Sequence, residues 1–174
     1  MPTLKTIKPL LVATSLAAML AAGWGGLHLA RVRLVLNLTI SVPRGVYLVR
    51  QGHRSGLQHG DLVEFSVPDE FTGFVYGRRW LTSGTPLLKT VGGMPGDSIC
   101  VGAGRFTLNG VDTGPVFTLD SEGKPMPALH GCVRVQAGDF LPINTSYARS
   151  FDGRYMGPVS ASLITGYATP LWTF

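Results

Sequence analysis

A lysine and a serine are the side chains whose chemistry is most informative. The chain has only four lysines, and Lys89 alone lies in an apolar run, the segment 86–91 (PLLKTV). Such a lysine has two interpretations. Its stem can lie on a strand with the ammonium in water, or the whole side chain can be buried, which lowers the pKa and makes the amine a general base. A neutral lysine can activate a serine hydroxyl, which is a weak nucleophile without an adjacent base.

Four segments together resemble a known family. They are 37–47 (NLTISVPRGVY), 89–97 (KTVGGMPGD), 150–159 (SFDGRYMGPV) and 166–172 (GYATPLW). In this order and spacing they resemble the signal peptidase family, and most of all the conjugative-transfer signal peptidases of the TraF group. Departures from the common pattern are Val42, Thr90 and Gly153, and none of them is a proposed proton-transfer residue.

The resemblance implies a set of site residues. Ser41 would be the nucleophile and Lys89 the base, while the Ser41 N–H and the Thr39 hydroxyl would stabilise the oxyanion. On a strand, positions 39 and 41 face the same side, although Thr39 could equally be a β-branched strand residue. Asp152 and Arg154 would form an ion pair that orients Lys89, with a purely structural pair in a turn as the alternative. The resemblance implies no metal and no cofactor.

Composition and turn residues indicate a mainly β fold. The 23 glycines and 12 prolines make up a fifth of the 174 residues and argue against a helical bundle. We expect coiled antiparallel sheets of the signal-peptidase type, with a strand over residues 31–41 and another over 86–91. Residues 108–111 (LNGV) predict a tight hairpin. The segment 69–81 is the one plausible helix outside the N-terminal region, weakened by its glycines.

The N-terminal region has the pattern of a membrane anchor. Residues 9–30 carry no charge and, as a helix, would be about 33 Å long, enough for a hydrocarbon core of about 30 Å. We therefore predict a cytoplasmic tail over residues 1–8, a transmembrane anchor over 9–30 and a periplasmic protease domain over 31–174. A cleaved secretory signal is the alternative for this segment. Residues 1–60 hold seven basic and no acidic side chains, a distribution that favours a lipid surface over nucleic acid.

The cysteines and histidines suggest other roles. Cys100 and Cys132 form an even pair, which in an exported domain favours a disulfide, with free buried thiols as the alternative. No His–Asp arrangement for catalysis is apparent, because His53 and His59 lie in a glycine-rich polar loop that we expect to be exposed.

Together these observations predict a membrane-anchored serine endopeptidase with a Ser41–Lys89 dyad. The resemblance implies a membrane-tethered precursor as substrate, such as a conjugative pilin, which would be hydrolysed or cyclised in the bacterial periplasm at the inner membrane. One rival is a housekeeping signal peptidase, and another is a non-enzymatic anchored β-domain of a secretion apparatus. A self-cleaving repressor is disfavoured by the absence of a DNA-binding segment. The oligomeric state and the scissile bond do not follow from the sequence.

Overall fold

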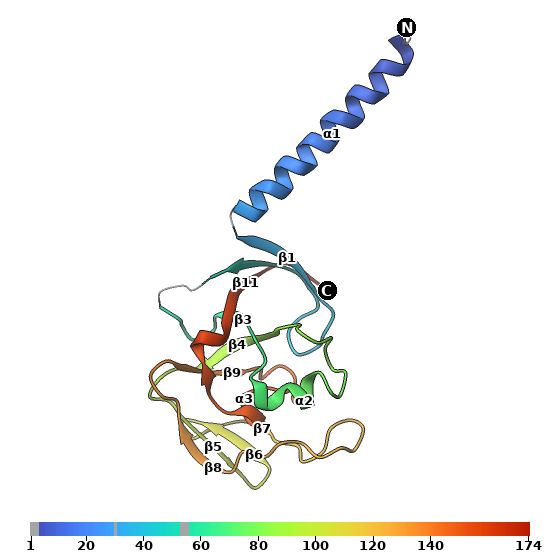
Figure 1. Cartoon of the computed structure of the whole chain (residues 1–174). Helices are drawn as coiled ribbons and strands as arrows, with labels where there is room; N and C mark the ends of the chain where they lie inside the picture. The colour runs from blue at the N-terminus through green and yellow to red at the C-terminus, as the bar shows by residue number, and fades with distance from the viewer. Residues whose placement is uncertain (1–3, 30, 53–55) are drawn as a thin grey trace.

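Short antiparallel strands make up most of the chain after the N-terminal helix (Figure 1). The computed structural model describes residues 4–29, 31–52 and 56–174. In chain order the helices and strands are α1 (Leu4–Leu29), β1 (Val32–Asn37), β2 (Gly45–Gln51), β3 (Leu62–Phe65), the 3₁₀ helix η1 (Asp69–Phe71), α2 (Thr72–Val75), β4 (Leu87–Gly93), β5 (Ser98–Gly102), β6 (Arg105–Leu108), β7 (Val111–Pro115), β8 (Gly131–Arg134), β9 (Asp139–Ile143), α3 (Gly153–Met156), β10 (Val159–Ser160), η2 (Ala161–Leu163) and β11 (Ile164–Thr173).

The strands form two sheets. A seven-stranded sheet has the order β1-β2-β11-β3-β4-β9-β10, and a four-stranded sheet has the order β7-β6-β5-β8. All the strand pairs in the described residues are antiparallel. The prediction of a mainly β, antiparallel architecture is therefore confirmed.

The main hydrophobic core lies between the large sheet and the two short helices α2 and α3. Its buried members are Val63, Phe65, Val67, Val75, Leu87, Val91, Phe140, Phe151, Tyr155, Met156, Val159 and Ile164. A smaller core under the four-stranded sheet contains Ile99, Phe106, Val135, Leu141 and Ile143. Strand β9 contributes residues to both cores, and β4 pairs with it, so these two strands form a well-packed base for a site.

Strand β4 turns Lys89 into the protein. Along this strand Leu87, Lys89 and Val91 are buried while Leu88 and Thr90 are half-exposed, which is the period-2 alternation of a strand. Lys89 lies opposite Val63 of β3. The lysine thus takes a core-facing position, and of the two sequence interpretations the buried one describes this structure.

The first strand is shorter than predicted. We expected residues 31–41 to be one strand, but β1 ends at Asn37 and residues 38–44 form an irregular loop. The Asn37 side chain forms hydrogen bonds with backbone N–H and C=O groups of this loop. Such side-chain hydrogen bonds compete with the backbone pairing of a sheet. Thr39 and Ser41 are therefore loop residues, and the strand argument that places them on one face does not apply.

The predicted helix over residues 69–81 is also shorter. Only η1 and the four-residue α2 are helical, and the chain then turns through Arg79, whose φ is +59°. Glycines at 73 and 77 weaken helix propagation here, because glycine loses more conformational freedom than other residues.

The N-terminal region forms the 26-residue helix α1, which includes most of the predicted anchor segment 9–30. Among the described residues, however, no helix meets both the length and the hydropathy that crossing a membrane requires. The predicted transmembrane helix is thus not found. Alanine and glycine, which carry little apolar surface, make up much of the segment.

The small sheet contains the predicted hairpin and a disulfide. Asn109 and Gly110 connect β6 to β7 with φ values of +51° and +80°, as a two-residue type I′ turn requires. Cys100 of β5 and Cys132 of β8 lie opposite each other and are joined by a disulfide with an S–S distance of 2.06 Å.

Candidate active site

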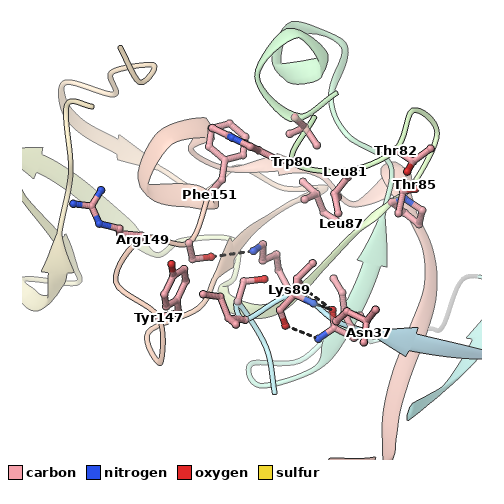
Figure 2. A pocket seen from close by; sticks show the side chains of 18 of the residues that line it. Asn37, Trp80, Leu81, Thr82, Thr85, Leu87, Lys89, Tyr147, Arg149 and Phe151 are labelled. Carbon is pink, nitrogen blue, oxygen red and sulfur yellow. Dashed lines mark hydrogen bonds between the residues drawn. The ribbon is translucent and has the colours of Figure 1, made fainter. Parts of the chain in front are cut away.

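Both residues of the candidate dyad line one cavity of about 880 Å³, which Figure 2 shows around Lys89. Ser41 and Thr39 reach it from the loop after β1, and Lys89 reaches it from β4. Its apolar lining includes Val35, Leu36, Leu38, Ile40, Val75, Trp80, Leu81, Leu87, Leu88, Phe117, Met126 and Phe151. A cavity of this size and apolar character can hold an extended peptide segment with small or apolar side chains.

Lys89 is almost completely buried, with an exposed fraction of 3%. Its Nζ donates a hydrogen bond to Ser150 Oγ over 2.9 Å, within the buried wall of the cavity. Burial lowers the pKa of Lys89 from 10.5 to about 8, and the charge of Asp152 raises it while that of Arg154 lowers it further. An amine with a pKa near 8 is neutral in about a tenth of molecules at pH 7, compared with fewer than about 1 in 1000 for an ordinary lysine.

Ser150 was not singled out by sequence reasoning. It is buried, it lines the cavity, and it is 61 positions from Lys89 in the chain. The only sequence signal was its place in the segment 150–159, two residues before Asp152. Its hydroxyl oxygen accepts a hydrogen bond from Nζ, which orients the amine within the cavity wall.

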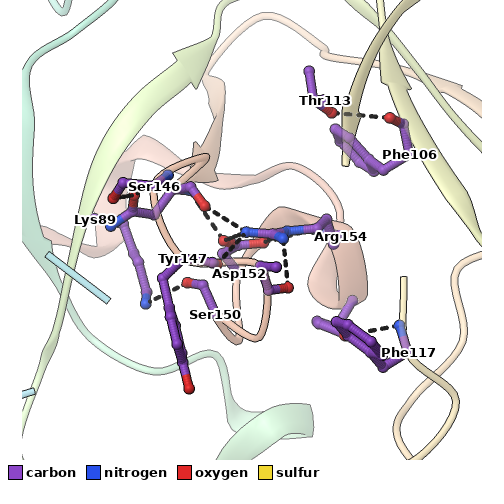
Figure 3. Close-up of polar contacts among 12 residues, drawn as sticks. Lys89, Phe106, Thr113, Phe117, Ser146, Tyr147, Ser150, Asp152 and Arg154 are labelled. Carbon is purple, nitrogen blue, oxygen red and sulfur yellow. Dashed lines mark hydrogen bonds and ion pairs between the residues drawn. The ribbon is translucent and has the colours of Figure 1, made fainter. Parts of the chain in front are cut away.

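Asp152 and Arg154 form the expected ion pair, and both are essentially inaccessible to solvent (Figure 3). Arg154 Nη2 lies 2.9 Å from Asp152 Oδ2, and Arg154 Nε donates to Asp152 Oδ1 over 2.9 Å. The fork geometry of arginine suits such a bidentate contact. Among the described contacts the pair makes no direct hydrogen bond to Lys89. It acts on the lysine through its charges and through the position of residues 144–152.

The same arginine ties down the loop that precedes it. Arg154 donates to the backbone carbonyls of Asn144, Tyr147 and Ala148, and Asp152 Oδ2 accepts the N–H of Asn144. These contacts hold residues 144–152 against the end of β9. Ser150 lies within this loop, and its position next to Lys89 is fixed by the buried pair.

Ser41 occupies the opposite loop and is half-buried. Among the described residues no hydrogen bond joins Ser41 to Lys89, although both line the same cavity. The Thr39 hydroxyl donates to Asn37 Oδ1 over 2.6 Å. A hydroxyl has a single proton, so Thr39 must turn away from Asn37 before it can donate to a substrate oxyanion.

A His–Asp contact lies elsewhere. His59 Nε2 is 3.3 Å from Asp97 Oδ2, but the imidazole is mostly exposed and neither residue lines the cavity. His53 lies outside the described residues. Within the part of the chain that the structure describes, no three His, Cys, Asp or Glu side chains are grouped to hold a metal ion.

A protein-family model matches nearly the whole chain. The model of the signal peptidases, peptidase S26, aligns with residues 4–172. The chain belongs to this family. Serine protease activity is therefore expected of it at the level of the family.

Curated relatives carry more specific names. A conjugal transfer protein TraF of Agrobacterium fabrum is 36% identical over 148 residues, which cover 80% of this chain and 82% of the relative. A plasmid transfer protein TraF of Escherichia coli is 26% identical over 168 residues, with 91% of each chain covered. Among solved structures, a signal peptidase I from Enterococcus faecalis is matched with a TM-score of 0.40 and 18% identity, over 67% of this chain and 100% of that one.

Proposed function

We propose that this S26 family member is a serine endopeptidase in which Ser41 is the nucleophile and Lys89 the general base. The observation that carries the proposal is the burial of Lys89 in the wall of the cavity that Ser41 also lines. Burial increases the fraction of neutral amine near neutral pH, and a neutral amine is the form that can take a proton from a serine.

The reaction then proceeds in two acyl-transfer steps. The proton of Ser41 Oγ passes to Lys89 Nζ while Oγ forms a bond to the scissile carbonyl carbon. The C–N bond breaks, and protonated Lys89 returns the proton to the leaving amine. Water or a peptide amine finally attacks the ester carbonyl carbon and gives a proton to Lys89 Nζ. The C–O bond to Ser41 breaks and Lys89 returns the proton to Ser41 Oγ, so that hydrolysis or cyclisation ends the reaction.

The supporting residues have matching roles in this proposal. The contact with Ser150 directs one N–H of the neutral amine away from Ser41, which leaves the Nζ lone pair free for the serine proton. The backbone N–H of Ser41 and the Thr39 hydroxyl, after rotation, would bind the oxyanion. Asp152 and Arg154 hold the loop that carries Ser150.

For the substrate we propose an exported precursor protein that is needed for conjugation, such as a pilin precursor, held at the inner membrane and processed on its periplasmic side. The names of the curated relatives, conjugal and plasmid transfer proteins, support this choice. The apolar lining of the cavity suits a substrate segment with small or apolar side chains, which agrees with this proposal. A housekeeping signal peptidase would instead cleave many unrelated exported proteins.

The test is a comparison of exported proteins, by mass spectrometry, from cells with wild-type enzyme, Ser41→Ala or Ser83→Ala. Ser83 is an exposed serine outside the cavity lining and serves as the matched control. We expect one conjugation precursor to accumulate with Ser41→Ala only. Normal processing by Ser41→Ala would indicate a non-enzymatic domain, and accumulation of many unrelated precursors would indicate a housekeeping peptidase.

A further inference from the structure

The side chain of Asn37, the last residue of β1, makes five hydrogen bonds that have no role in the proposed mechanism. Its side chain is buried, with 7% exposed, and it lines the cavity beside the loop that carries Ser41. Figure 2 shows Asn37 with two of these contacts drawn. A buried side-chain amide with this many hydrogen-bond partners restricts the conformation of the backbone segment that it contacts.

The oxygen of the Asn37 side chain holds the first turn of the loop. Oδ1 accepts the backbone N–H of Thr39 over 3.1 Å and the Thr39 hydroxyl over 2.6 Å. This turn ends the strand and sets the direction in which the chain leaves it. It also keeps the Thr39 hydroxyl in a defined place next to the cavity.

The nitrogen of the same side chain holds the other half of the loop. Nδ2 donates to the carbonyl oxygens of Thr39, Val42 and Pro43, at 3.0, 3.2 and 3.0 Å. Two amide protons are thus shared among three acceptors. Ser41 lies between Thr39 and Val42, so the chain is held on both sides of the nucleophile by one side chain.

We infer that Asn37 is a positioning residue for the nucleophile, an inference that rests on the proposed function of Ser41. It contacts neither the substrate bond nor Lys89 among the described hydrogen bonds. It acts by keeping the loop 38–43 in the conformation that directs Ser41 and the Thr39 hydroxyl to the cavity. A displacement of about 1 Å at such a site can lower a rate by about 100-fold.

Two substitutions separate the two halves of this contact. Asn37→Asp keeps an acceptor for Thr39 and removes the donor to the three carbonyls, whereas Asn37→Ala removes both. We expect either variant to lower kcat by about 10- to 100-fold, with KM changed by less than about twofold because the apolar lining is intact. The pH midpoint set by Lys89 stays in place in Asn37→Ala, which adds no charge to the cavity that both residues line.

The matched control is Asn109→Ala. Asn109 also makes two side-chain hydrogen bonds, to the Ser98 N–H and to Asp97, but it lies in the small sheet away from the cavity. Its φ of +51° makes alanine unfavourable there. We expect this variant to lose stability without a fall in kcat, so that a loss of kcat cannot be attributed to stability alone.

Amide hydrogen exchange gives a readout that does not depend on activity. The Thr39 N–H should exchange slowly in the wild-type protein and quickly in Asn37→Ala. Rapid exchange of Thr39 in the wild type would overturn the inference even if neither variant folds. Wild-type kcat in a folded Asn37 variant would overturn the inference as well, and so would an equal loss of kcat in Asn109→Ala.

Ser41→Ala, measured in the same assay, separates the two proposals, because residual cleavage there refutes the proposed function itself.

Discussion

The pH dependence of cleavage is the most direct consequence of a buried Lys89. The competent form of a general base is the deprotonated one, and burial places the pKa of this amine at about 8. The neutral fraction is then about 1% at pH 6, about 10% at pH 7 and about 90% at pH 9. We therefore expect kcat/KM, which reports pKa values of the free enzyme, to rise about tenfold per pH unit below 8 and to level off above 9.

The charges around Lys89 provide a test of the cause. Asp152 raises the pKa of the amine, and Arg154 lowers it. Asp152→Asn removes the negative charge that raises the pKa of Lys89 and leaves the positive charge of Arg154, so the variant favours the neutral amine. In the fraction of this variant that folds, the midpoint of the normalised pH profile should move to lower pH.

The assay is the initial rate of cleavage of a quenched fluorescent peptide that spans the site found by mass spectrometry, measured from pH 6 to 10. Lys89→Arg should be inactive at every pH, because guanidinium does not lose its proton in this range. Lys124→Arg is the matched control, since Lys124 is exposed and paired with Glu122. A pH-independent wild-type rate, or near-normal turnover by Lys89→Arg, would refute the reasoning.

Four further outcomes are expected. Lys89→Met should raise the free energy of unfolding at pH 7 by up to about 3 kcal/mol, because the pKa of Lys89 is lower in the folded state than in the unfolded state. In urea unfolding, this gain in stability should shrink as the pH rises from about 8 towards 10.5. Thr39→Val should lower kcat by about 100- to 1000-fold, as loss of one oxyanion donor does, while Thr39→Ser keeps most activity, and a wild-type rate in Thr39→Val would remove the oxyanion role. Replacing Cys100 and Cys132 by serine should cost about 3–4 kcal/mol in urea unfolding, and peptide mapping that finds both thiols free in periplasmic protein would contradict the bridge. Arg154→Met should destabilise the fold by about 3–5 kcal/mol, because it leaves a buried carboxylate without its partner; a change below about 1 kcal/mol would show that the pair is not needed.

The β architecture was predictable because its signals are local. A turn of asparagine and glycine flanked by Leu108 and Val111 is enough to specify the hairpin at 108–111, and the structure contains it. The alternating burial in β4 likewise follows from the strand period. In contrast, the helix predicted over 69–81 is reduced to η1 and α2, because Gly73 and Gly77 weaken helix propagation. The aromatic side chains of this segment still pack against Phe151.

The extent of β1 was not predictable from its composition. Residues 38–40 are apolar or β-branched and fit a strand pattern, yet they leave the sheet. The deciding group is the Asn37 amide, which offers the backbone a different set of hydrogen bonds from those of a partner strand. The sequence shows that an asparagine is present, but it does not show whether its side chain points inward. Only an inward side chain can form hydrogen bonds with several backbone groups of the following loop.

The state of Lys89 has the same dependence on long-range packing. The apolar neighbours in the segment 86–91 allow either a snorkelling or a buried lysine, and the choice depends on what covers the side chain. In the structure the cover includes the loop that carries Ser150, which Arg154 holds in place through three backbone carbonyls. The chemistry of the base therefore depends on an ion pair more than 60 residues away in the chain. A short motif can identify the lysine as a candidate, but only the assembled fold gives it the lowered pKa that a base near neutral pH needs.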